Sequence, residues 1–169
     1  GNGAFVTLYG NNFGTSPTVT VGGGQAIIKL APVTYLWYQK MTIQLGASAA
    51  TGNIVVTNSN GSSNGLPFTV RSGNIYFVAT TGSDSAAGTF AAPWKTLGYA
   101  QGAIAAGDII YARNGVIATN DGAVYNAALI LGTAGTTDNV KAFVAYPGET
   151  ATIGSVSGQD RGLMLCNGL

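Results

Sequence analysis

Apolar and polar positions alternate in short runs through residues 1–71, and Gly, Asn and Pro interrupt the runs. Alternation with period two is typical of half-buried strands, and turn signals that recur about every ten residues are typical of an antiparallel sandwich. The pattern therefore predicts a small all-β domain of two sheets. Its expected strands lie at residues 5–9, 18–21, 41–45, 53–57 and 68–70.

One segment of the chain has the spacing of a helix. Trp94, Leu97 and Ile104 recur at positions that share one helical face, which predicts a helix of about three turns. Pro93 suits the first turn of such a helix. Because a glycine inside a helix costs about 1 kcal/mol relative to alanine, we expect packing to hold this helix, with interior glycines such as Gly102 facing a neighbouring element.

Outside this helix the second half of the chain has period two. Short strands are expected between turns, at intervals typical of the rungs of a solenoid. They lie at residues 74–79, 108–115, 127–131, 140–148, 151–153 and 162–165. A mainly β fold therefore continues through the second half.

Charged residues divide the chain near Arg71. Residues 1–71 contain the cationic side chains Lys29, Lys40 and Arg71 and no Asp or Glu, whereas all of the acidic residues come later. Such a shift predicts two modules, at residues 1–71 and 74–169, that abut through a short joint.

Four stretches of the first module carry a family resemblance. They are VTLYGNNFG at residues 6–14, TVTVGG at 18–23, GNIVVTN at 52–58 and SNGLPFTV at 63–70. In this order they resemble the IPT/TIG domain, an immunoglobulin-like sandwich, over nearly all of residues 1–71. Gly10 and Gly14 are expected to flank a tight turn that returns Phe13 to the core. IPT/TIG domains act as spacers, as interaction modules or as accessory domains beside carbohydrate enzymes, and the fold alone does not choose among these roles.

A second resemblance covers residues 74–153. Its motifs are YFV at residues 76–78, GSD at 82–84, GTF at 88–90, PWKTL at 93–97, GDIIY at 107–111 and AYPGE at 145–149. Together they resemble the N-terminal end of a right-handed parallel β-helix of the pectate-lyase-like superfamily, which implies that the helix caps the open end of the solenoid. The expected fold class is mainly β, an immunoglobulin-like β-sandwich followed by an N-terminal capping helix and the first rungs of a right-handed parallel β-helix.

Composition narrows the function classes. Only 8% of the residues are charged and the net charge is +1, which argues against a nucleic-acid partner, and no apolar run is long enough to span a membrane. Histidine is absent and cysteine occurs once, which excludes Ser-His-Asp catalysis, His-ligated metal sites and an internal disulfide. Abundant Gly, Thr, Ser and Asn is typical of secreted or cell-surface β proteins, and we expect that localisation.

The densest aromatic cluster offers a candidate carbohydrate-binding surface at Trp37 and Tyr38. If the strand is regular, Tyr35 and Trp37 share the core face with Met41, and Tyr38 beside Lys40 points outward. Two interpretations follow: a sugar platform that includes Trp37 and Tyr38, or core packing and interdomain contact. The alternation favours packing.

Candidate chemistry is otherwise sparse. Asp84 could ligate calcium together with backbone carbonyls, but one carboxylate is few for such a site, and an Asx-turn that organises the loop before the helix is the preferred interpretation. Asp108 is expected to serve a similar turn. The β-helix resemblance implies lyase chemistry with a Lys or Arg base and acidic calcium ligands, yet Arg113 and Lys141 are expected to be solvated charges. Cys166 is expected to be a buried structural cysteine. With all of these candidates assigned to other roles, the sequence predicts no catalytic residues.

Two hypotheses for function follow. In the first, the chain is a piece of a secreted or cell-surface modular protein, with a pectate-lyase-like parent, that binds or degrades extracellular polysaccharide, and the piece itself is catalytically silent. A piece is expected because a bare last rung would expose a strand edge. In the second, the chain is a structural adhesin, fibre or surface-layer module that assembles with neighbouring chains through its β-rungs, as a homo-oligomer or filament without enzymatic activity.

Overall fold

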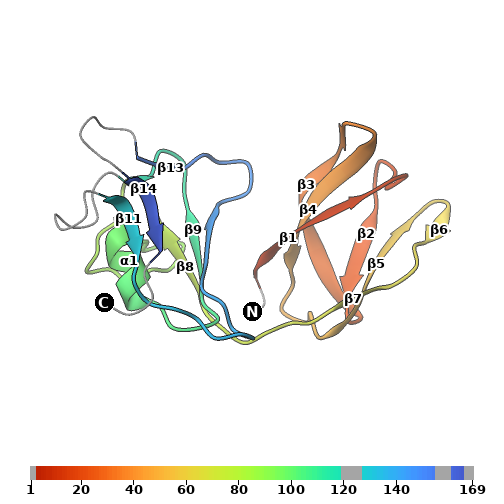
Figure 1. The fold of residues 1–169 in the computed structure, drawn as a ribbon. Coiled ribbons are helices and arrows are strands. Elements are labelled where there is room, and N and C mark those ends of the chain that lie inside the picture. Colours follow the sequence, from red (N-terminus) through yellow and green to blue (C-terminus); the bar gives the residue numbers. More distant parts are fainter. Residues whose placement is uncertain (1–2, 119–126, 155–160, 166–169) are drawn as a thin grey trace. The chain divides into compact units, whose positions relative to one another are not determined.

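The structure is a computed structural model that describes residues 3–118, 127–154 and 161–165, and the chain folds into two compact units. We call them the sandwich unit, Gly1–Arg71, and the ladder unit, Ser72–Leu169 (Figure 1). Both units are mainly β, and the described residues form one short helix. Within the described ranges, no helix combines the length and the hydropathy needed to cross a bilayer.

In its described residues the sandwich unit has seven strands. They are β1 (Phe5–Gly10), β2 (Thr18–Val21), β3 (Gly24–Tyr35), β4 (Tyr38–Leu45), β5 (Gly52–Asn58), β6 (Gly61–Ser62) and β7 (Leu66–Phe68). Strands β1, β4 and β3 pair in that order, the start of β3 pairs with β2, and β5 pairs with β2, β6 and β7, always antiparallel. This pairing is consistent with the expected immunoglobulin-like β-sandwich.

Buried side chains follow the predicted alternation in the sandwich unit. The inward positions of its central strands are almost fully buried, because successive side chains of a strand point to opposite faces. These positions are Val19, Val21, Met41, Ile43 and Ile54.

The turn after β1 returns an aromatic ring to the core. Phe13 is buried, and its ring lies so close to Gly10 that a Cβ there would sit 3.0 Å from it. Asn12 and Gly14 adopt φ values of 58° and 78°, which reverse the chain on either side of Phe13. The expected role of this turn is confirmed.

Two irregularities in β3 determine what the outer face of the sheet presents. The register with β4 shifts between Ile28 and Leu30, and again between Leu30 and Val33. Each shift inserts one extra residue in β3, as a β-bulge does, and resets the alternation. Leu30 and Val33 are consequently exposed and pair with Thr42 and Lys40 on the face away from the core.

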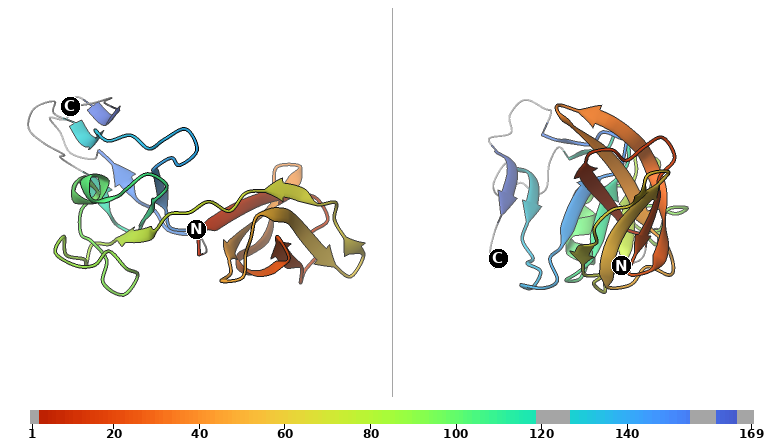
Figure 2. Two further views of the ribbon diagram at one scale, coloured as in Figure 1. Left: turned by 90° about the horizontal axis from the view of Figure 1, so that it is seen from below. Right: turned by 90° about the vertical axis from the view of Figure 1, so that its right-hand side faces the viewer.

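The ladder unit contains eight described elements, of which seven are strands and one is the helix. They are β8 (Ile75–Val78), α1 (Leu97–Ala103), β9 (Ile109–Ala112), β10 (Ile117–Ala118), β11 (Ala127–Leu131), β12 (Ala142–Ala145), β13 (Thr152–Ile153) and β14 (Arg161–Leu165). Among the described residues of this unit, every pairing between strands is parallel. Figures 1 and 2 show β11 and β14 side by side.

Paired strands of the ladder unit are separated by a nearly constant interval in the sequence. The first pairs are Ile109 with Ala142 in β9 and β12, Ile117 with Thr152 in β10 and β13, and Ala127 with Arg161 in β11 and β14. Each partner lies 33 to 35 residues further along the chain. Strand β8 precedes β9 by a similar interval, since Ile75 pairs with Ile109.

One hydrophobic cluster joins the helix to the first strand of each ladder. Its members include Val78 of β8, Leu97 and Ala100 of α1, Ile110 of β9, Ala118 of β10 and Leu129 of β11. Helix α1 therefore gains its stability from packing, as its glycine content predicted.

The helix is shorter than the sequence predicted. It spans Leu97–Ala103, and the hydroxyl of its N-cap residue Thr96 accepts the amide of Tyr99 at 3.2 Å. Trp94 lies outside the helix because its backbone runs beside β8, where its amide donates to the carbonyl of Phe77 at 2.9 Å. The carbonyl of Trp94 accepts the amide of Ala79 at 2.9 Å, so it is not available to accept an amide from the next turn of a helix.

Two glycines of the ladder unit provide a matched test of this packing. A Cβ at Gly82 would collide with the carbonyl of Trp94, whereas no atom of the described residues outside the backbone of the helix lies within 4 Å of a Cβ at Gly102. The expectation that Gly102 faces a neighbouring element is therefore wrong.

We predict that Gly82→Ala lowers the free energy of unfolding by about 1–3 kcal/mol, since backbone must move. Gly102→Ala should raise it by at most about 1 kcal/mol. Chemical denaturation followed by circular dichroism measures both, and equal effects would contradict the prediction.

Candidate functional site

The hairpin between β3 and β4 ends in two exposed residues. Leu36 and Trp37 form the turn, and Tyr35 pairs with Tyr38 across it. Leu36 has a φ of 57°, a left-handed conformation that is strained for a bulky side chain. Trp37 is 82% exposed. The strained turn therefore holds a large aromatic ring in solvent, as functional sites often do.

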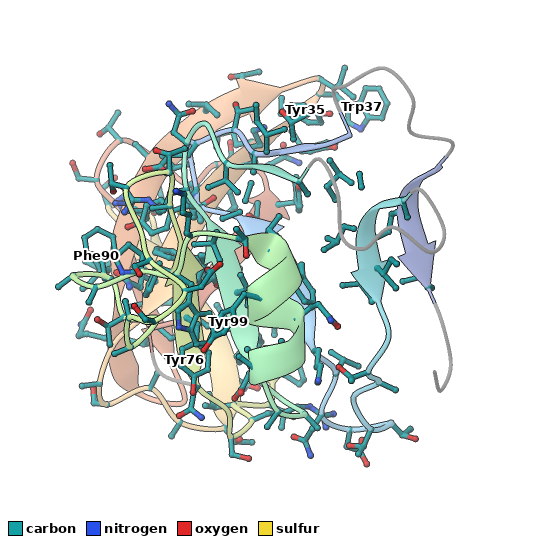
Figure 3. All side chains as sticks on the ribbon, turned by 90° about the vertical axis from the view of Figure 1, so that its left-hand side faces the viewer. Tyr35, Trp37, Tyr76, Phe90 and Tyr99 are labelled. Carbon is teal, nitrogen blue, oxygen red and sulfur yellow. The ribbon has the colours of Figure 1, made fainter. Side chains whose placement is uncertain are left out.

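Tyr35 and Trp37 do not lie on the core face, so that prediction is wrong. It treated residues 35–45 as one strand, whereas the chain reverses direction between Tyr35 and Tyr38. Tyr35 belongs to β3 and lies opposite Tyr38, on the face away from the buried Met41, and it is 44% exposed. Figure 3 shows the side chains of Tyr35 and Trp37 at the end of the hairpin.

Four aromatic rings and one lysine gather at this end of the sheet. The ring centroid of Tyr38 lies 5.6 Å from that of Tyr9, 5.5 Å from that of Tyr35 and 6.1 Å from that of Trp37. The ammonium of Lys40 lies 4.5 Å from the centroid of Tyr35. We call these five residues the aromatic tip. Tyr9 is not among the residues predicted from the sequence, because only the register of β1 with β4, which pairs Tyr9 with Lys40, brings it here.

A groove of about 340 Å³ lies beside the aromatic tip on the same sheet. Residues that line it include Thr7, Tyr9, Leu30, Val33, Lys40 and Thr42. Because β4 runs between β1 and β3, Tyr9 stands on one side of the groove, Val33 stands on the other, and Lys40 lies between them. The groove therefore combines apolar walls with one lysine and two threonines.

A second hollow, of about 440 Å³, opens between the end of β1 and the hairpin of β5 and β6. Its polar groups serve the fold. The side-chain amide of Asn58 donates to the carbonyls of Asn12 and Phe13 at 2.7 and 3.2 Å, and its oxygen accepts the amide of Asn60 at 2.8 Å. These bonds hold the Phe13 turn in place.

In the ladder unit, the carboxylate of Asp84 holds the start of α1. Its Oδ1 accepts the amides of Lys95 and Thr96, each at 2.9 Å, and its Oδ2 accepts the hydroxyl of Thr96 at 2.8 Å. Desolvation by burial would raise the pKa of this carboxyl, but the hydrogen bonds from Thr96 and Lys95 outweigh it and lower the pKa below the ordinary value of 3.8. Calcium needs several oxygen ligands, and here N–H and O–H donors bind both carboxylate oxygens. The geometry therefore favours the preferred interpretation, a carboxylate that organises the loop before the helix, over a calcium ligand.

Asp84→Asn tests this role of the carboxylate. The variant keeps the size of the side chain but loses the charge and one acceptor, and we expect it to lower the free energy of unfolding by about 1 kcal/mol near neutral pH. Because the folded-state pKa is lowered, this contribution is present above the unfolded-state pKa and is lost as the pH falls through the folded-state pKa. Urea denaturation of both proteins at several pH values should therefore show a difference that shrinks below about pH 4. A difference that stays constant into acid would contradict this role.

The buried carboxylate of Asp108 accepts hydrogen bonds from two separate segments of the ladder unit. It is 3% exposed. Its Oδ1 accepts the amide of Asn74 at 2.7 Å, and its Oδ2 accepts the amide of Ala105 at 2.8 Å. The carboxylate therefore ties the turn after α1 to the start of β8, which agrees with the expected structural turn.

Arg113 is paired, so the prediction of a solvated charge is wrong. Its Nε and Nη2 each donate to the carboxylate of Glu149 at 2.7 Å, and the amide of Asn114 donates to the same carboxylate at 2.7 Å. Its guanidinium also lies over the rings of Phe90 and Tyr146, 4.7 and 4.6 Å from their centroids. The hydrogen bonds to Glu149 raise the pKa of Arg113. The sequence could not show this pair, because its members are separated by 36 positions.

Replacement of Arg113 measures how much the fork-shaped guanidinium contributes. Arg113→Lys keeps the charge but cannot form both bonds to Glu149 or stack on the rings in the same way. We expect the free energy of unfolding to fall by about 1–2 kcal/mol, because hydrogen bonds between charged groups are the strong ones. The exposed Lys95→Met is the control and should change stability by less than about 0.5 kcal/mol. If the Arg113→Lys protein has the same free energy of unfolding as the parent chain, the paired hydrogen bonds of the guanidinium contribute nothing to stability.

The remaining candidates do not assemble a catalytic group. Lys141 donates from Nζ to the hydroxyl of Thr133 at 2.6 Å. In the part of the chain that the structure describes, no cluster of three or more His, Cys, Asp or Glu residues could hold a metal ion. Cys166, the expected structural cysteine, lies outside the described residues.

Comparison with known proteins adds the following. Residues 1–70 match the IPT/TIG domain family, which confirms the resemblance for the sandwich unit. No curated protein matches the chain. A solved structure described as the complex of XylC with xylose is 30% identical, covers 47% of this chain and 11% of its own, and has a TM-score of 0.39. A solved structure described as a rhamnogalacturonan lyase is 22% identical, and the match covers 56% of this chain and 28% of that chain with a TM-score of 0.41. The chain thus spans far less than two thirds of either protein.

Proposed function

We propose that the chain is part of a secreted or cell-surface modular protein that associates with extracellular polysaccharide. In this proposal the sandwich unit is an accessory domain. The ladder unit is the beginning of a right-handed parallel β-helix of the pectate-lyase-like kind, and α1 is its N-terminal cap. The observation that carries the proposal is the interval of 33 to 35 residues between paired parallel strands.

A β-helix explains this interval. Strands β9, β10 and β11 are followed by β12, β13 and β14, which pair with them in the same order, as successive coils with three strands each would do. Connections between parallel strands of one sheet are right-handed in about 98% of cases. Helix α1 buries Leu97 and Ala100 in the cluster that the first strand of each ladder lines, which is the place a cap would take.

Association with polysaccharide is supported by the family resemblance of the ladder motifs and by the exposed rings of the sandwich unit. The flat face of a sugar presents C–H groups that pack on aromatic rings, and Tyr and Trp combine such a ring with a polar group. Tyr9, Tyr35 and Trp37 are 63%, 44% and 82% exposed. A platform of this kind suits an accessory domain that holds an enzyme or an assembly on its polymer.

The described residues support binding more than catalysis. Arg113 is engaged by Glu149, and Lys141 donates to Thr133, so neither stands among several carboxylates as a calcium-assisted base would. We therefore expect the chain itself to be catalytically silent.

A structural module remains the second candidate, and one observation favours it. Within the described residues, β12, β13 and β14 each pair on one side only. Their exposed apolar side chains include Val144, Ile153, Leu163 and Leu165. Such edges accept further strands, so an adhesin, fibre or surface-layer element could assemble with neighbouring chains through them.

One pair of measurements separates these functions. In native gels that contain pectin or alginate, we expect the full chain to migrate more slowly than in plain gels. Incubated with the same polymers and calcium, it should release no unsaturated product by absorbance. Product formation would contradict the predicted silence. Concentration-dependent self-association in sedimentation, with no retardation by any polysaccharide, would reject the first proposal and favour the structural module.

A further inference from the structure

We propose that the aromatic tip and the adjoining groove bind a polysaccharide that carries carboxylates, and that Lys40 selects the charged sugar. The inference rests on the proposed association with polysaccharide and assigns it a site and a substrate class. It is carried by the position of one ammonium over Tyr35, a member of a cluster of four aromatic rings, in a unit whose sequence contains no acidic side chain.

The rings are spaced for a chain of sugars. Tyr9 lies on β1 and Tyr35 on β3, on either side of β4, so they are about two strand spacings or 10 Å apart. Trp37 extends the surface beyond the turn, and the half-buried Tyr38 lies against all three of the other rings. Contacts with Tyr38 restrict these rings before binding, which reduces the side-chain entropy lost when a ligand packs on them.

The charge of the site favours an anion. Lys40 lines the groove between Tyr9 and Val33, and its ammonium lies 4.5 Å from the ring centroid of Tyr35. Thr7 and the buried Thr42, whose hydroxyls are 3.3 Å apart, line the same groove. Residues 1–71 contain no Asp or Glu, so no carboxylate of this unit competes with a ligand for the ammonium of Lys40. A sugar carboxylate beside Lys40 would gain a charge-assisted hydrogen bond, while neighbouring sugar hydroxyls could bond to the threonines.

Other occupants fit this surface less well. A single-stranded nucleic acid is usually held by several cationic side chains along a groove, and Lys40 is the one cation among the described residues that line this groove. A second copy in a two-fold contact would place Lys40 against the same positive unit. An anionic polysaccharide satisfies both the rings and the charge.

The test is affinity electrophoresis of the full 169-residue chain. Gels contain polygalacturonate, its neutral methyl ester or dextran. Lys40→Met removes the charge and keeps an aliphatic stem, and Lys40→Arg retains the charge. Trp37→Ala removes an exposed ring without opening the core. Lys95→Met, in the ladder unit, is the matched control for loss of one charge. Circular dichroism of each variant verifies that it folds.

We expect polygalacturonate to retard the chain more than either neutral polymer does. Lys40→Met and Trp37→Ala should each weaken the apparent affinity roughly tenfold, whereas Lys40→Arg and Lys95→Met should stay within about threefold of the parent chain. Retardation by polygalacturonate should also fall as salt is added, because salt screens the exposed pair.

Several results would overturn the inference. Equal retardation by neutral and anionic polymers, or an unchanged Lys40→Met variant, would reject the substrate class while the proposed association with polysaccharide stands. Equal binding of an oligothymidylate would show a general preference for polyanions, and loss of self-association in Trp37→Ala would identify a second copy as the occupant. Absence of retardation by every polymer would reject both the site and the proposed function.

Discussion

Backbone hydrogen bonds between strands 33 to 35 residues apart are the constraint on which the ladder unit depends. The hydrogen bonds of a parallel pair are evenly spaced along the two strands. A shift of the pairing by one residue would turn every side chain of a strand to the opposite face of the sheet. The repeated interval keeps Ile110 and Leu129 directed at the cluster that contains Leu97 of α1. Two carboxylates then fix the ends of the helical segment: Asp84 binds the amides at its start, and Asp108 binds the turn that follows.

The sandwich unit uses its two sheet faces differently. One face of β4 buries Met41 and Ile43 in the core, and the opposite face carries Tyr38 and Lys40. Bulges in β3 keep apolar side chains on that outer face, and the strained turn at Leu36 places a tryptophan beyond its end. A regular hairpin with a glycine turn would be less strained. The local geometry thus gives up some backbone stability and presents an exposed aromatic surface beside a lysine.

Local patterns in the sequence predicted much of the fold, and pairing between distant segments accounts for what it missed. Alternation located most strands of the sandwich unit, and the short motifs identified its family. The core assignment of Tyr35 failed because alternation cannot show where one strand reverses into the next. Arg113 was expected to be solvated, since its partner Glu149 is remote in the sequence. The contribution of Tyr9 to the site depends on strand register, which the residue pattern leaves open.

The parallel pairing of the ladder unit is most directly tested by proton contacts measured with nuclear magnetic resonance. The account predicts contacts between amide and α protons of β9 and β12, with Ile110 opposite Phe143, and the same parallel pattern between β11 and β14. Strong contacts between α protons of facing residues, which arise in antiparallel ladders, would contradict it. Pairing of β12 with a strand other than β9 would also contradict it.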